Sequence, residues 1–138
     1  MDTLADDLDT RLAALWRTLG RRGKREMSRT GASVLATLRD TGPRRITELA
    51  DAEAVAQPTV TTLVGRLERD GLVRRRPDRQ DARAVRVHLT AEGLERLQTM
   101  RAARTALLEH RLKDFDDGER AALAAALPLL DRLMEEDE

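Results

Sequence analysis

Residues 56–90 decide the fold of this chain, and they read AQPTVTTLVGRLERDGLVRRRPDRQDARAVRVHLT. Pro58 stands in what would be the first turn of a helix, where its missing N–H costs nothing, and Gly71 tolerates the left-handed backbone that often ends one. Between them, apolar residues follow the i, i+3, i+4, i+7 spacing of a helix with one buried side: Val60, Leu63, Val64 and Leu67. We therefore expect a helix over residues 57–69.

A β-hairpin is expected directly after this helix. In residues 85–89, apolar side chains alternate with Arg86 and His88, which is the pattern of a half-buried strand. Residues 72–76 form the other predicted strand, and the polar segment PDRQDARA joins the two. Residues 45–46 could add a very short strand. The hairpin therefore has a basic tip.

Three further helices are expected before residue 56 or at its edge. Apolar residues recur at helical spacing over residues 4–19, which predicts an amphipathic N-terminal helix. Ser28 is the expected N-cap of a second helix over residues 29–39. Thr47 is the expected cap of a short third helix, residues 48–54.

Two long helices are expected after the hairpin. Thr90 caps the first, which should run over residues 91–115. Asp116 and Glu119 form a capping box that starts the last helix, and Pro128 should kink or break that helix. The chain is therefore mainly α with a small β-hairpin, an α+β arrangement.

The composition excludes several classes of protein. The 138 residues include no cysteine, so disulfides and thiolate metal sites are ruled out. With one Trp and one Phe and no Tyr, the core must be aliphatic. No run approaches the length of a membrane span, and the acidic N-terminus does not resemble a signal peptide. We expect a cytoplasmic protein with no membrane partner.

Neither an enzyme nor a metal site is predicted. The two serines both fall in the second helix, and no pairing of a nucleophile with a base is visible. The two histidines, His88 and His110, stand on separate elements and do not make a metal site. We expect no cofactor and no bound metal.

Positive charge is concentrated in the middle of the chain, although the net charge is zero. Residues 66–86 contain eight arginines against four acidic residues, whereas both ends of the chain are acidic. This distribution predicts a polyanionic partner for the middle of the chain only.

Two helices, a turn, a third helix and a basic hairpin together make a winged helix-turn-helix. The major groove of DNA, about 12 Å wide, admits one helix, and short polar side chains let the start of that helix approach the base edges. Arginines at the tip of the hairpin suit the narrow minor groove with its negative potential. The sequence therefore predicts binding to double-stranded DNA.

The residues also resemble the MarR family of bacterial transcription regulators. The resemblance rests on QPTVTTLVGRLERDGLV followed by RRRPDRQDARAVRVHLTAEG, and above all on the wing pattern Asp81-x-Arg83, then Val87-x-Leu89-Thr90-x-x-Gly93. It implies an obligate homodimer on a pseudo-palindromic operator. It also implies that the protein is a repressor, which a small anionic or aromatic effector releases from the operator. While bound to DNA, such a repressor would be associated with the nucleoid.

The resemblance assigns roles to particular residues. Arg83 matches the wing arginine placed in the minor groove, and Asp81 matches the residue that orients it through a charge-assisted hydrogen bond. Ala54 stands where relatives often have the glycine of the turn. The full set of expected DNA contacts, with the recognition helix at about 57–69 and the wing at 74–88, is Thr47, Gln57, Pro58, Thr59, Thr61, Thr62, Arg66, Arg74, Arg75, Arg79, Asp81 and Arg83.

The resemblance also divides the chain into three segments. Residues 1–26 and 91–138 would form the dimerisation region, and residues 27–90 the DNA-binding domain. Trp16 is a candidate for the effector pocket. The expected dimer contacts are apolar: Leu4, Leu8, Leu12, Leu15, Leu112, Phe115, Leu123, Leu127 and Leu130.

Two alternative functions stay open on the sequence. The basic face could hold an acidic protein, which would make the chain a winged-helix module for protein interaction. It could also bind DNA without sequence preference or ligand control, as an architectural protein does.

Overall fold

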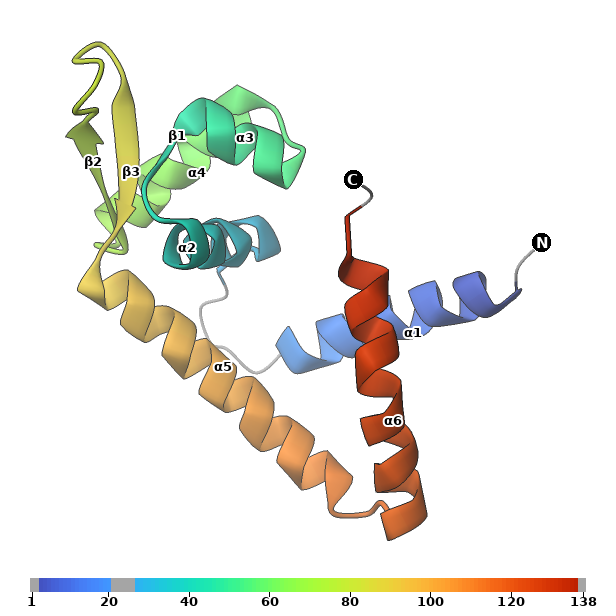
Figure 1. Cartoon of the computed structure of the whole chain (residues 1–138). Coiled ribbons are helices and arrows are strands. Elements are labelled where there is room, and N and C mark those ends of the chain that lie inside the picture. The colour runs from blue at the N-terminus through green and yellow to red at the C-terminus, as the bar shows by residue number, and fades with distance from the viewer. Residues whose placement is uncertain (1–2, 21–26, 137–138) are drawn as a thin grey trace. The chain divides into compact units, whose positions relative to one another are not determined.

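A computed structural model describes residues 3–20 and 27–136 of the chain, which divides into two compact units, Met1–Ala102 and Ala103–Glu138. Figure 1 shows the nine elements of these described residues. In order they are α1 (Thr3–Gly20), α2 (Arg29–Thr41), β1 (Arg44–Arg45), α3 (Ile46–Glu53), α4 (Gln57–Arg69), β2 (Val73–Pro77), β3 (Val85–Leu89), α5 (Ala91–Leu112) and α6 (Asp117–Met134).

The first unit contains a winged helix-turn-helix, as the sequence predicts. In Figure 1, α2, α3 and α4 gather beside the β2–β3 hairpin. The sheet is antiparallel with the order β1-β3-β2, and its register pairs Arg76 with Arg86 and Arg45 with Arg86. The predicted helix over 57–69 and the predicted strand over 85–89 are both confirmed, and the short strand lies one residue earlier than expected.

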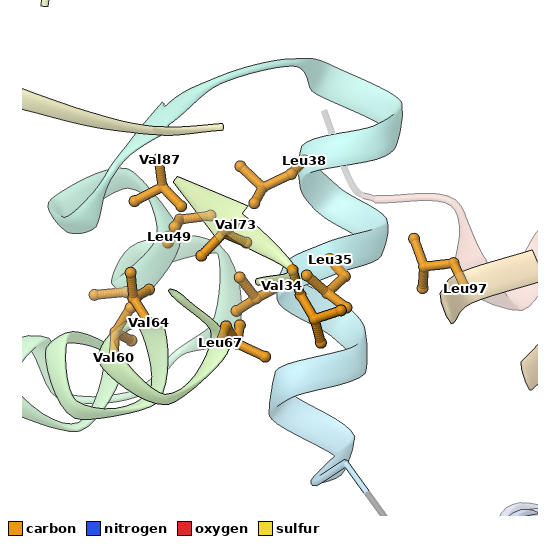
Figure 2. Close-up of a cluster of buried hydrophobic side chains, with 12 residues drawn as sticks. Val34, Leu35, Leu38, Leu49, Val60, Val64, Leu67, Val73, Val87 and Leu97 are labelled. Atoms are coloured by element: carbon orange, nitrogen blue, oxygen red, sulfur yellow. The ribbon is translucent and has the colours of Figure 1, made fainter. Parts of the chain in front are cut away.

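An aliphatic core holds the winged helix together (Figure 2). Each fully buried side chain of this size contributes about 1.5–3 kcal/mol relative to exposure. Leu97 of α5 belongs to the same cluster, so the first turns of α5 pack with the winged helix. The largest fully buried side chains are Val34, Leu35, Leu49, Val60, Val64, Val73 and Val87.

The junction between the wing and α5 is packed so closely that it requires a glycine. The Thr90 hydroxyl donates to the carbonyl of Gly71 (2.7 Å) and accepts from the backbone N–H of Gly93 (3.0 Å), which confirms Thr90 as a cap. A Cβ at Gly93 would overlap the carbonyl oxygen of Leu72. The start of α5 is therefore held against residues 71–72, directly before β2.

Two further helix caps predicted from the sequence are confirmed, and one is wrong. Ser28 accepts a hydrogen bond from Gly31, and Asp116 and Glu119 exchange the two bonds of a capping box. Thr47 is not a cap, because α3 begins at Ile46 directly after β1. The Glu48 carboxylate instead accepts from the backbone N–H of Arg45 (3.2 Å).

The last two helices differ from expectation at one end and in one interior. Helix α5 ends at Leu112, three residues before the predicted end. Helix α6 continues through Pro128 without a break. The proline removes one helical hydrogen bond, and the carbonyl that loses its donor belongs to Ala124, which is exposed to solvent. No helix in residues 3–20 and 27–136 is long and apolar enough to span a bilayer.

Ala54 ends α3 in the left-handed conformation, with φ 54° and ψ 40°, and is the one non-glycine residue with positive φ in the described chain. Such a conformation costs an L-residue about 1–2 kcal/mol. The tight turn between α3 and α4 imposes it, because the N–H groups of Ala54 and Val55 donate back to Asp51 and Ala50 (both 3.2 Å).

Replacing Ala54 with glycine is expected to raise the free energy of unfolding by about 0.5–1 kcal/mol, because the lost strain exceeds the added freedom of the unfolded chain. Urea denaturation at one fixed protein concentration measures this. As a matched control, Ala52→Gly on the exposed side of α3 should lower the free energy of unfolding by up to about 1 kcal/mol. A loss of stability in both variants would show that Ala54 is not strained.

Candidate nucleic-acid interface

Helix α4 presents a face of short polar side chains to solvent. Its opposite side is in the core through Val60, Val64 and Leu67. The hydroxyls of Thr61 and Thr62 donate to the carbonyls one turn earlier, at 3.0 and 3.1 Å, which leaves their oxygen lone pairs available as acceptors. The exposed residues from the predicted set on this helix are Gln57, Pro58, Thr59, Thr61, Thr62 and Arg66.

The wing adds exposed positive charge beside this helix. One of its arginines is joined to α4: the Arg75 backbone N–H donates to the Glu68 carboxylate (3.1 Å), and the Arg75 guanidinium lies 3.7 Å from the same carboxylate. This ion pair is half-exposed, so it fixes the side chain more than it stabilises the fold. The predicted wing arginines Arg74, Arg75, Arg79 and Arg83 are all exposed, as is Thr47 in the first turn of α3.

Asp81 shapes the wing loop through the backbone and not through the Arg83 guanidinium. Its carboxylate accepts from the backbone N–H of Arg83 (3.0 Å), and its carbonyl accepts from the N–H of Ala84 (3.0 Å). No ion pair joins it to Arg83 within the part of the chain that the structure describes. The expected charge-assisted bond is therefore wrong for this structure, because a carboxylate two residues before an N–H closes an Asx turn.

The sequence reasoning missed Asp78, a buried carboxylate at the base of the wing loop. Its side chain is 1% exposed and accepts from Arg45 (2.8 and 3.0 Å) and from Arg86 (2.9 Å). Its second oxygen accepts from the N–H of Gln80 (2.8 Å). We call Asp78, Arg45 and Arg86 the wing clamp, because it joins β1, β3 and the loop at one carboxylate.

The wing clamp changes the acidity of its carboxyl group. The N–H of Gln80 and the guanidiniums of Arg86 and Arg45 stabilise the ionised form and hold the pKa of Asp78 well below its usual range. On β3, the strand that carries Arg86, partial burial lowers the pKa of His88, and the positive charges of the nearby arginines lower it further. The clamp therefore stays ionised throughout the neutral range.

The predicted dimer contacts lie on α1, on α6 and around the end of α5. Neither α1 nor α6 has a buried residue in its described part. Leu8, Leu112 and Leu130 are partly buried, whereas Leu4, Leu12, Leu15, Phe115, Leu123 and Leu127 are exposed. The effector candidate Trp16 is 44% exposed. Across residues 3–20 and 27–136, no cluster of three His, Asp or Glu side chains could hold a metal ion.

Comparisons with known proteins extend over most of the chain. A family model described as the MarR family matches residues 27–85. The HTH-type transcriptional repressor NicR of Pseudomonas putida is 38% identical over 104 residues, which make up 75% of this chain and 64% of NicR. An uncharacterised HTH-type transcriptional regulator of Mycobacterium bovis is 33% identical over 134 residues, 96% of this chain and 94% of that one. A solved structure from Pseudomonas aeruginosa PA01 superposes with a TM-score of 0.86 at 34% identity, covering 98% of this chain and 96% of that chain.

The variant Asp78→Asn is expected to be less stable than the wild type at pH 7, and the difference should shrink in acid. The pKa of Asp78 is lower in the folded protein than the ordinary value of about 4 in the unfolded chain. The ionised carboxylate therefore stabilises the fold above about pH 4, and this contribution is lost as the pH falls toward the folded pKa.

Denaturant midpoints at pH 7, 5 and 3 measure this dependence. The variant Asp81→Asn is the matched control, because Asp81 is exposed and its carboxylate accepts a single backbone hydrogen bond. If wild type and Asp78→Asn differ by the same amount at pH 3 as at pH 7, the charge of Asp78 is not what holds the wing.

Proposed function

This chain belongs to the MarR family of transcriptional regulators, a family of DNA-binding winged-helix proteins, and on that premise we propose that it represses transcription as a homodimer on a pseudo-palindromic operator. In this proposal α4 lies in the major groove, and the wing contacts the backbone and the minor groove. The observation that carries the proposal is that α4 exposes a face of short polar side chains and that the neighbouring wing exposes arginines.

The chemistry of the two surfaces supports different tasks. The start of α4 exposes an amide and hydroxyls, which can donate to and accept from base edges, and it places no charge before Arg66. Arginines suit phosphate oxygens and narrow minor grooves, where they add affinity with little information about sequence. We therefore assign base reading to α4 and backbone binding to the wing.

Pairing of two chains is supported by the apolar side chains of α1 and α6. In a single chain, Leu4, Leu127 and Leu133 are 64%, 59% and 64% exposed, and they are accompanied by several other leucines on the same two helices. Exposed apolar surface on this scale is typical of an interface. We propose that residues 1–26 and 91–138 pair two copies, whose half-sites then lie about one helical turn, roughly 10 bp, apart.

Two finer parts of the proposal concern control and location. We propose that a small anionic or aromatic effector releases the dimer from DNA, with Trp16 in its pocket, and that the protein acts in the cytoplasm. Calorimetric titration with phenolic acids, followed by DNA binding in their presence, tests the effector. No heat and unchanged DNA binding would remove this class of ligand.

The variant Arg83→Ala should bind the operator about 10- to 100-fold more weakly, because a groove-reading arginine is worth about 1–3 kcal/mol. The operator is first located by footprinting the DNA upstream of the chain's own gene, and affinity is then measured by fluorescence anisotropy. Arg101→Ala, which removes an exposed arginine from α5, controls for the loss of one charge. Equal affinities of Arg83→Ala and Arg101→Ala would exclude the wing tip from the interface.

The same measurements on the wild type test the two alternative functions. Equal binding to operator and to unrelated DNA would favour an architectural role, and no DNA binding would favour a protein partner.

The variant Leu127→Glu should lower the affinity of the dimer by at least about 100-fold, because an apolar interface cannot satisfy a buried carboxylate. Analytical ultracentrifugation measures the change, since the dimer has twice the chain mass of 15.5 kDa. The control Asp131→Ala alters an exposed polar position on the same helix and should stay dimeric. A Leu127→Glu variant that is folded and still dimeric would show that α6 does not form the interface.

A further inference from the structure

The wing sheet has two faces with different environments. In β3, Val87 is buried against the core, so Arg86 and His88, its neighbours along the strand, point to the opposite face. Residues paired across antiparallel strands share a face, and the partners of Arg86 and His88 are Arg76 and Arg74. This outer face is turned away from the core on which α4 packs, and it is distinct from the surface assigned to base reading.

A hollow of about 430 Å³ lies on this outer face. Three arginines line it, whereas Asp78 is its single acidic group, so its net charge is about +2 with a neutral histidine. The complete lining is Pro43, Arg76, Pro77, Asp78, Arg79, Gln80, Arg86 and His88. Such a surface suits an anion.

The wing clamp fixes one of these arginines before any ligand arrives. Arg86 donates to Asp78 through Nε, and no protein hydrogen bond in the described chain uses its two terminal nitrogens. Arg45 holds the same carboxylate from β1, so the carboxylate cannot swing away. A guanidinium held by a buried carboxylate loses little conformational entropy on binding and keeps donors for a second oxyanion.

Three arginines of the hollow lie around its histidine. Partial burial is the main cause that lowers the pKa of His88, and the positive charges of Arg76, Arg86 and Arg79 lower it further. No carboxylate other than Asp78 lines the hollow, and two arginines already occupy that one. The excess positive charge has no counter-charge within the described structure of the hollow.

We propose that this hollow is a phosphate-binding site, which takes a backbone phosphate of duplex DNA outside the half-site that α4 reads. The inference rests on the proposed function, because it takes the wing to lie along the duplex. Arg79 belongs both to the loop assigned to the minor groove and to the lining of the hollow. The strand that leaves the minor groove would therefore pass the outer face, and each protomer would neutralise one or more additional phosphates.

Two duplexes test this site. The first carries only the two half-sites, whose limits are found by substituting base pairs within the footprinted operator, and the second extends it by six base pairs on each side. Anisotropy titrations of the wild type over a range of salt concentrations should give tighter binding to the extended duplex by about tenfold. The slope of log K against log salt should be steeper by about 2, since each of two protomers displaces counterions from about one more phosphate.

Variants of two lining arginines locate the effect. Arg76→Gln leaves the wing clamp intact, because Arg76 makes none of its bonds, and Arg86→Gln removes one arm of the clamp. Both should lose most of the gain from the flanking sequence. Arg76→Gln should bind the short duplex as the wild type does, whereas Arg86→Gln should bind it more weakly, because losing one arm of the clamp also disturbs the wing loop. The control Arg101→Gln removes an equal charge from α5 and should keep the gain.

Inorganic phosphate distinguishes a site for DNA from a site for a free anion. The chain has two histidines, so the imidazole NMR signal of His88 reports on the hollow and that of His110 is an internal reference. A shift of His88 by submillimolar phosphate, with no effect of the flanking sequence, would assign the hollow to a free anion and overturn the proposal. If the wild type binds the short operator but gains nothing from the flanks, the inference fails and the proposed function stands. If it binds no operator, both fail.

Discussion

Every large element of the winged helix meets the others at one aliphatic core, and its contacts come from sequence positions far apart. Leu35 of α2, Val64 of α4 and Val87 of β3 are each fully buried, although more than fifty residues separate the first from the last. With one Phe and one Trp in the whole sequence, no large ring fills the space between the layers. Small β-branched and leucine side chains must fit closely instead, so loss of one methylene group leaves a void that neighbours cannot fill. Helix α4 and the wing therefore keep a fixed position relative to each other because they share this core.

Local patterns were enough to predict the helices and the hairpin, whereas the polar contacts at the wing were not predictable in this way. Helix α4 was predicted from spacing and from Pro58 and Gly71, all within one short segment. The bond between Asp78 and Arg45 joins residues 33 positions apart and requires β1 to pair with β3. A strand of two residues is too short to have a sequence pattern that predicts this pairing. Thr47 and Asp81 show a different limit. A neighbouring carboxylate took the capping role expected of Thr47, and the backbone of Arg83 took the bond expected of its side chain.

The neutral net charge of the chain is the sum of a basic middle and acidic ends. The wing is basic, and within it Asp78 is the single buried charged residue among those described. That carboxylate does not neutralise the wing but spaces two of its guanidiniums, since both remain about one third exposed. Buried ion pairs are poor sources of net stability and better sources of geometry. The wing clamp fits this rule, because it sets where positive charge is presented more than how much charge there is.

The glycine at the start of α5 has a consequence for how proteins of this design can diverge. Any side chain at Gly93 must displace the backbone of Leu72, so nearly every substitution there disturbs the junction that Thr90 closes. Changes at Thr59 or Arg79 touch no buried contact, since both side chains are exposed. Substitutions can therefore accumulate at exposed positions without affecting folding. At the junction, steric overlap with the backbone of Leu72 prevents them. The exposed side chains of α4 and the wing can change between related proteins because the junction that positions them stays the same.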